Sequence, residues 1–482
     1  MQAVSNKLAE VRTHQYKNLL PPESHGRLIF SVSETLPPSL ARIINHEQTG
    51  STMKALAWFG ARDVRLIDAP IPDITEPDDV ILKVTGTTIC GSDLHLSVPR
   101  RNNSTTRGDI LGHEFMGIVD RVGPNVHNVH IGQRVVASFQ IACGECSYCK
   151  QKLSSMCDRT NSSGQVFLHI ITCSIFMGIF IGSRTRCTAT ATRGFFRILA
   201  LHGRLPWWSG RIRARAQGET STCSLSRTLF PMRRRSISRT SSLPATTQSS
   251  MSGVKEGDVV GIWGLGPIGQ CAARFALMKG ASRVIGIDNV RERLLMAESS
   301  GIEVINFSEH TDVVKRIQEL VPGGLDVAID CGTFHQPKTL LHKVEKTLML
   351  ETDVPEIVNE MIMATRKMGS CGIIAAYAGY TNHFNIGALM EKGIRLIGHG
   401  QAPVHKYWHD LLATIEAGKF DPTFVVTHRV SLDEFPALYA SFDKRVAGVE
   451  KVFVETKFSA PPSVGTPKLS RVADWGLDIY TV

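Results

Sequence analysis

The feature that most constrains the fold is a glycine-rich turn between a strand-like run and a helix-like run. The apolar run Val259–Trp263 leads directly into G-L-G-P-I-G at 264–269, and a helical pattern over 270–279 follows. A second strand-like run, Arg283–Ile287, ends in Asp288. Strand, glycine turn, helix and strand in this order predict a βαβ unit of a parallel sheet.

The same unit predicts a dinucleotide site. Gly264, Gly266 and Gly269 have the G-x-G-x-x-G spacing, which lets the backbone approach a pyrophosphate at the helix N-terminus. Asp288 lies 19 residues after the last glycine, where a carboxylate accepts hydrogen bonds from the adenosine ribose hydroxyls. A carboxylate there repels a 2′-phosphate, so the pattern favours NAD over NADP.

Two alternatives stay open for this unit. Arg291 and Arg293 follow the acid closely, and an arginine near the ribose can accommodate the 2′-phosphate of NADP. A structural glycine turn in an unrelated α/β domain is the other alternative, and the complete strand–turn–helix–strand context argues against it.

A cysteine-dense loop predicts a structural metal site. Cys143, Cys146, Cys149 and Cys157 follow the spacing C-x2-C-x2-C-x7-C. Four thiolates on one short loop can close a tetrahedral zinc shell with no open position, which stabilises the loop and does no chemistry. An iron–sulfur ligand set has similar spacing but usually occurs in a different context, so we favour zinc.

A second group of metal-type residues lies upstream. It consists of C-G-S-D-L-H at 90–95 and G-H-E at 112–114. A thiolate, an imidazole and a nearby carboxylate suit a zinc ion with an open position, which polarises a carbonyl and lowers the pKa of an alcohol. Ser92 and His95 have the chemistry to pass a hydroxyl proton to solvent. Each residue alone is more often an ordinary core or surface residue, and only the combination gives these residues weight.

Together these motifs resemble the zinc-dependent medium-chain alcohol dehydrogenases, specifically the branch with the glutathione-independent formaldehyde dehydrogenases, over about 53–160 and 252–460. The resemblance implies an α/β fold with a Rossmann doubly wound parallel sheet and a GroES-like β-rich catalytic domain. It implies NAD, one structural and one catalytic Zn²⁺, and a small-molecule alcohol or aldehyde as substrate. It also implies a homo-oligomer, a dimer or tetramer.

The resemblance assigns roles by position. Cys90 and His113 would be zinc ligands, with Glu114 a close carboxylate that can move onto the metal. Ser92 and His95 would form the proton relay. The other assigned residues are Asp93 beside the ligand histidine, Gly264, Gly266, Gly269 and Asp288 at the cofactor, Arg293 near the ribose, and Cys143, Cys146, Cys149 and Cys157 at the second zinc. A polyol or threonine dehydrogenase of the same family, or a non-catalytic zinc- or nucleotide-binding relative, is the alternative function.

Residues 161–250 depart from the family's pattern. They hold thirteen Arg, no Lys, no Asp and one acid, Glu219, so this segment carries +12. The family needs a further zinc ligand shortly before the Rossmann strand, an Asp in a Leu-Ser-Asp-like motif, and 238–245 contains no Asp. We interpret the segment as a translated intron followed by an out-of-frame stretch, with the frame restored near Val254. We therefore expect an aberrant insert and impaired activity of the chain.

The overall charge does not favour a nucleic-acid or membrane-surface protein. The chain carries +10, so the residues outside 161–250 sum to −2. An RNA-binding or phosphorylatable insert around Arg233–Ser236 is the alternative for this segment. The sequence contains no uninterrupted apolar run of about 18 residues, so we expect no membrane span. Eleven Cys in 482 residues argue against a disulfide framework, and the first 52 residues lack a targeting pattern, so we expect a cytoplasmic protein.

The sequence therefore predicts five consecutive parts. They are a disordered or spurious extension (1–52), a GroES-like catalytic domain (53–160), the aberrant segment (161–250), a Rossmann domain (252–400) and the C-terminal part of the catalytic domain with a tail (401–482).

Overall fold

A computed structural model of the chain divides it into two compact units, Met1–His46 and Glu47–Val482, and all described residues lie in the second. The predicted site residues Ser92, His95 and His113 lie outside the described residues. The structure describes residues 52–60, 62–74, 77–91, 93, 107–112, 114–138, 142–159, 211–215, 223–225, 252–310, 312–332, 342, 345, 353–375, 377, 381–400, 403–443, 448–462 and 466–476.

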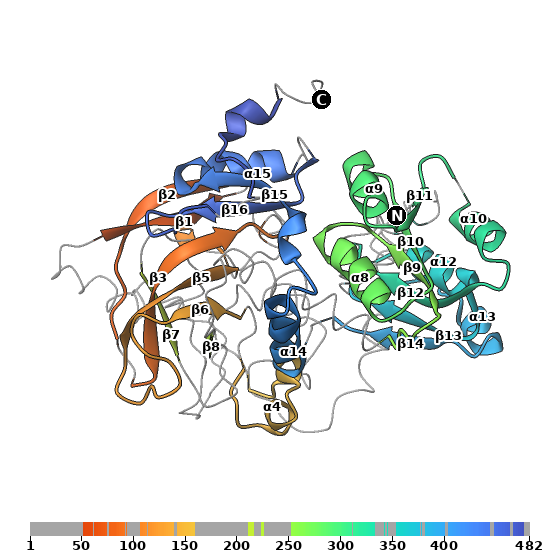
Figure 1. Ribbon diagram of the computed structural model, residues 1–482, viewed down its shortest axis with the longest axis horizontal. Helices are drawn as coiled ribbons and strands as arrows, with labels where there is room; N and C mark the ends of the chain where they lie inside the picture. The colour runs from red at the N-terminus through yellow and green to blue at the C-terminus, as the bar shows by residue number, and fades with distance from the viewer. Residues whose placement is uncertain are drawn as a thin grey trace, which may run out of the picture. The chain divides into compact units, whose positions relative to one another are not determined.

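The glycine turn belongs to a six-stranded, fully parallel sheet with the strand order β11-β10-β9-β12-β13-β14 (Figure 1). The chain starts in the middle, at β9, builds outward to β11 and then returns to the other side of β9. The strands are β9 Val259–Trp263, β10 Arg283–Asp288, β11 Glu303–Asn306, β12 Leu325–Asp330, β13 Thr365–Ile373 and β14 Arg395–Gly398. This order puts a topological switch point between β9 and β12, where open α/β sheets bind ligands.

Helices bury both faces of this sheet. Val260 and Ile262 of β9 pack in one apolar cluster with α8 and α9, whereas Trp263 packs in a second cluster with α10 and α12. The helices are α8 Pro267–Met278, α9 Arg291–Glu298, α10 Val313–Leu320, α12 Glu356–Ala364 and α13 Ile386–Glu391. Because side chains on both faces are buried, the central strands β9, β10 and β12 are largely apolar rather than alternating.

The second sheet is mainly antiparallel and brings together distant parts of the chain. Its order is β15-β16-β3-β5-β6-β8, with β7 also paired to β3. The strands are β3 Asp79–Thr88, β5 Phe115–Val122, β6 Arg134–Ala137, β7 Arg211–Arg215, β8 Cys223–Leu225, β15 Val426–Ser431 and β16 Lys451–Glu455. A smaller sheet, β2-β1-β4, contains β1 Thr52–Gly60, β2 Asp63–Pro70 and β4 Asp109–Ile110.

The C-terminal strand β16 completes the second sheet. Phe453 pairs with Thr88, and Val454 with Thr87, in antiparallel register. Two helices of this part of the chain, α14 Val404–Glu416 and α15 Phe435–Asp443, precede it. The packing of β16 on β3 brings residues near 450 next to the segment that follows β3.

The expected fold class, a parallel α/β sheet with a separate β-rich part, is confirmed. The helix expected at 270–279 begins earlier, at Pro267, because Gly266 is its N-cap and proline occupies its first position. Within 161–250, the backbone of β7 pairs with β3 and that of β8 with β6. The origin of that segment stays a prediction.

None of the helices in the described ranges is long and apolar enough to cross a bilayer.

Candidate functional site

Two glycines of the turn after β9, Gly264 and Gly269, have no room for a side chain. Gly264 has φ +87°, and a Cβ there would lie 2.9 Å from the Cα atom of Gly332. A Cβ on Gly269 would lie 1.9 Å from the carbonyl oxygen of Gly264. Gly266 caps α8, whose first backbone N–H groups have no partner within the helix. The turn therefore presents bare backbone and a helix N-terminus, the arrangement that suits a phosphate group.

Asp288, the last residue of β10, stabilises this turn by hydrogen bonds to the backbone. Its Oδ2 accepts a hydrogen bond from the backbone N–H of Leu265 at 2.7 Å. Its Oδ1 accepts from the N–H groups of Asn289 at 2.7 Å and Val290 at 3.0 Å. A carboxylate has about four acceptor sites, so three are engaged by backbone. Asp288 thus shapes the turn as well as offering negative charge beside it, a role that spacing alone did not predict.

Arg293, on the first turns of α9, lies beside the same carboxylate. Its Nη1 is 3.7 Å from Oδ2 of Asp288, and its Nε pairs with Oε1 of Glu450. A Cβ on Gly266 would lie 3.8 Å from Nη1 of Arg293, which puts the guanidinium at the mouth of the glycine turn. Arg291, the other candidate, is exposed. Glu450 had not been predicted, because it is 157 residues from Arg293 in sequence.

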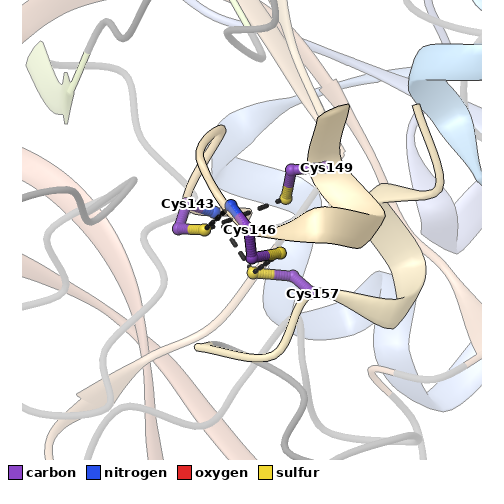
Figure 2. Close-up of side chains that lie close together, drawn as sticks. All are labelled: Cys143, Cys146, Cys149 and Cys157. Atoms are coloured by element: carbon purple, nitrogen blue, oxygen red, sulfur yellow. Dashed lines mark hydrogen bonds between the residues drawn. The ribbon is translucent and has the colours of Figure 1, made fainter. Parts of the chain in front are cut away.

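The four cysteines of the predicted structural site converge (Figure 2). Cys149 lies on the short helix α4 Ser147–Lys150, and Cys157 follows the 3-10 turn η2 Ser154–Met156. The four sulfur atoms all lie within 4.8 Å of one another. Two of these separations are 3.9 Å, between Cys143 and Cys149, and 4.0 Å, between Cys146 and Cys157.

These distances test whether the residues fit zinc. A tetrahedral shell with metal–sulfur bonds of about 2.3 Å has sulfur–sulfur edges of about 3.8 Å, close to the two separations. The N–H groups of Glu145 and Cys146 also donate to Sγ of Cys143, at 3.4 and 3.3 Å. Burial raises the pKa of the thiols of Cys143 and Cys149. A cation that binds there must therefore displace protons. The donor set and its geometry fit a closed zinc shell.

Cys90 and Asp93 of the other predicted site are tied together. Asp93 Oδ2 accepts a hydrogen bond from the N–H of Cys90 at 2.9 Å, and the N–H of Asp93 donates to the carbonyl of Cys90 at 3.1 Å. Asp93 is fully buried, whereas Cys90 is half-buried. This turn fixes the backbone at Cys90 directly after β3. The roles assigned to Ser92, His95 and His113 stay predictions.

Glu114, the predicted metal-side carboxylate, lies in a buried ion pair. Its Oε2 is 2.6 Å from Nζ of Lys451 and also accepts from the hydroxyl of Thr88. Glu114 and Lys451 are only 2% and 4% exposed. Phe453 of β16 pairs with Thr88 at the end of β3, and Lys451, two residues before Phe453, interacts electrostatically with Cys90, two residues after Thr88.

The charge of Lys451 is set by these neighbours. Burial alone would lower the pKa of Lys451, but the charges of Glu114, Cys90 and Asp93 outweigh it and the pKa lies above its ordinary value. Lys451 thus carries a positive charge within a cluster of acidic groups. Sequence analysis missed Lys451 although one signal was present, since it is a lone lysine at the head of the apolar run V-F-V.

Tyr439 on α15 is a further neighbour that sequence analysis missed. Its side chain is buried. Burial, together with the charges of Asp93 and Cys90, raises the pKa of Tyr439. The C-terminal part of the chain thus lines the candidate site from two elements, α15 and β16.

Comparison with known proteins agrees with this arrangement. Residues 76–194 match the alcohol dehydrogenase GroES-like domain, and residues 267–345 match the zinc-binding dehydrogenase domain. A zinc-type alcohol dehydrogenase-like protein of Schizosaccharomyces pombe is 38% identical over 85% of this chain and 92% of its own length. The chain belongs to the zinc-type alcohol dehydrogenase family. The expected family and zinc-dependent dehydrogenase function are thereby confirmed.

Two further similar proteins have lower sequence identity to this chain. The glutathione-independent formaldehyde dehydrogenase of Pseudomonas aeruginosa is 27% identical over 83% of this chain and 96% of its own length. The alcohol dehydrogenase of Thermus sp. ATN1 has a similar fold, with a TM-score of 0.65 at 24% identity over 84% of this chain and all of its own. The GroES-like match runs to residue 194 and so includes the first part of the 161–250 segment.

Proposed function

We propose that this alcohol dehydrogenase-like protein transfers a hydride reversibly between a small alcohol or aldehyde and NAD. The observation that carries the cofactor choice is the pair of acids near the glycine turn. Asp288 lies beside the turn, and Glu450 engages the nearby Arg293. A 2′-hydroxyl can donate to a carboxylate, whereas a 2′-phosphate would be repelled by it.

The proposal includes two zinc ions with different tasks. Cys143, Cys146, Cys149 and Cys157 would hold the structural ion, as their sulfur separations support. Cys90 and His113, with Glu114 close by, would hold the catalytic ion. A zinc ion with an open position would act as a Lewis acid that polarises the carbonyl group of an aldehyde and lowers the pKa of an alcohol.

The chain's own residues would then handle protons and charge. Ser92 and His95 would pass the hydroxyl proton of an alcohol toward solvent. Asp93 would orient the turn that carries Cys90, through its hydrogen bond to the N–H of that residue. Lys451 compensates the charge of Glu114, so this carboxylate can stay ionised in a buried position.

The test of the activity is NADH production, followed at 340 nm, with formaldehyde, primary alcohols, polyols and threonine as substrates. In a chain with the reading frame restored over 161–250, we expect turnover with NAD and a primary alcohol or aldehyde, and loss of more than about 100-fold in kcat for Cys90→Ser, because a positioned Lewis acid supplies several kcal/mol. Cys371→Ser, at a buried thiol of β13, is the matched control and should keep activity. Turnover only with polyols or threonine would favour the alternative substrates.

Metal content separates the two zinc ions. In a protein whose ligands are complete, we expect about two zinc ions per chain by inductively coupled plasma mass spectrometry. The zinc content should fall by about one for Cys149→Ser and by about one for Cys90→Ser. Iron in place of zinc at the four-cysteine loop would overturn the structural-zinc assignment. Light scattering and cell fractionation test the remaining expectations, a dimer or tetramer in the cytoplasm.

A further inference from the structure

Contacts of the backbone and the side chain fix the position of Glu450 beside Arg293. Glu450 directly precedes β16, and its backbone N–H donates to Oγ1 of Thr427 at 3.0 Å. Two residues earlier, Gly448 has φ +62°, and a Cβ there would lie 2.7 Å from Cγ of Glu292 on α9. This segment therefore packs against the first turn of α9, the helix that carries Arg293.

The contact defines the electrostatics beside the ribose position. Arg293 lies between two carboxylates, with Nε on Glu450 and Nη1 3.7 Å from Asp288. The three side chains are 17%, 2% and 7% exposed, in the order Arg293, Glu450, Asp288. These three side chains carry two negative charges and one positive charge, and their interactions are strong because little water screens them.

We propose that Glu450 is a specificity-determining residue that makes the site select a 2′-hydroxyl over a 2′-phosphate. An arginine near the ribose would otherwise attract the phosphate, since its planar fork matches phosphate oxygens. Glu450 binds the Nε face of that fork and neutralises its charge. The acid thereby converts Arg293 from a potential phosphate ligand into part of a negative surface. This inference rests on the proposed nicotinamide-dependent function.

The test compares cofactor binding with and without the acid. Glu450→Gln removes the charge and keeps the shape, so the positive charge of Arg293 is no longer compensated at position 450 and a phosphate can use it. In calorimetric titrations of the full chain, we expect the NADP affinity relative to NAD to rise at least about tenfold. Adenosine 2′,5′-bisphosphate measured against 5′-AMP should show the same rise without the nicotinamide half. Should the Gln variant fail to fold, Glu450→Ser makes the same test, because water can then solvate Arg293.

Three variants separate this role from a structural one. Glu455→Gln removes a comparable acid at the other end of β16, paired with Arg429 at 3.1 Å, and should leave the NADP/NAD ratio unchanged. Glu450→Asp keeps the charge and should retain the NAD preference. In the double variant Glu450→Gln with Arg293→Ala, the gain in NADP affinity should vanish, because the freed arginine is its cause.

The outcomes distinguish this inference from the proposed function. A wild-type chain that binds NAD while folded Glu450→Gln keeps the wild-type ratio would overturn the role of Glu450 alone. An equal shift for Glu455→Gln would overturn it as well. A folded wild-type chain that binds neither NAD nor NADP would instead contradict the proposed cofactor-dependent function.

Discussion

At the scale of single residues, the candidate site is organised by buried charges whose partners come from distant strands. Glu114 precedes β5 and Lys451 begins β16, yet their side chains meet at 2.6 Å. Each charge is costly to bury alone, and together they compensate. Glu450 and Lys451 are neighbours in sequence but serve two regions, the first engaging Arg293 and the second Glu114.

Removal of Lys451 should therefore cost stability. Lys451→Met leaves Glu114 buried without its cation, and we expect the free energy of unfolding to fall by about 3–5 kcal/mol in urea titrations. Lys54→Met is the control, because Lys54 and its partner Asp68 are 50% and 58% exposed, and such pairs contribute about 0–1 kcal/mol. Equal losses of unfolding free energy for the two substitutions would contradict the compensation of Glu114 by Lys451.

His428 should make stability depend on pH. Burial lowers the pKa of His428 from its ordinary 6.5 to about 4, so the folded protein keeps the ring neutral while the unfolded chain takes up a proton. The free energy of unfolding is therefore unaffected by His428 above about pH 6.5. It decreases as the pH falls toward 4, by at most ~1.4 kcal/mol per pH unit. His428→Gln should flatten that part of the curve of unfolding free energy against pH. His127→Gln, at an exposed position, should leave the curve unchanged.

At the scale of elements, the β9 turn and the four-cysteine loop are local constructions. Gly269 lies in the first turn of α8, where its missing side chain leaves room for the carbonyl of Gly264. The cysteine loop spans Cys143 to Cys157 and closes on itself through α4 and η2. Both elements follow from short sequence spacings, so their residues could be predicted without the fold.

The glycine turn should reject even one methyl group. Gly269→Ala places a Cβ 1.9 Å from a backbone oxygen, and we expect a loss of about 1–3 kcal/mol in unfolding free energy. NAD affinity should fall as well, because the turn must shift. Gly323→Ala, where a Cβ would meet nothing within 4 Å, is the matched control. Unchanged stability and NAD binding in Gly269→Ala would contradict the tight packing.

At the scale of the whole molecule, the question is whether 161–250 belongs to the active protein. Its charge of +12 and its missing acidic ligand led us to propose an intron followed by an out-of-frame stretch. Two parts of this segment pair with the second sheet through their backbone, β7 with β3 and β8 with β6. The match to the GroES-like domain also includes the segment up to residue 194. Sequencing of the spliced transcript decides its origin.

A direct comparison tests the functional consequence. We expect a chain with the reading frame restored over 161–250 to bind about one more zinc and to produce NADH at least about 100-fold faster than the 482-residue chain, because ligand number sets metal affinity. The additional bound zinc should also raise the melting temperature of the frame-restored chain. Full activity and two zinc ions in the 482-residue chain would contradict the missing-ligand hypothesis.

The sequence by itself determined what short spacings encode. The G-x-G-x-x-G turn with Asp288 predicted the parallel sheet, and the four cysteines predicted their own cluster, because residues within one loop or one βαβ unit are forced together by chain connectivity. Only the tertiary structure decided which side chains surround Glu114 and Arg293. Lys451 reaches Glu114 through the pairing of β16 with β3, and Glu450 reaches Arg293 because the segment around Gly448 packs on α9. Such long-range contacts depend on the packing of whole sheets and helices rather than on any local pattern.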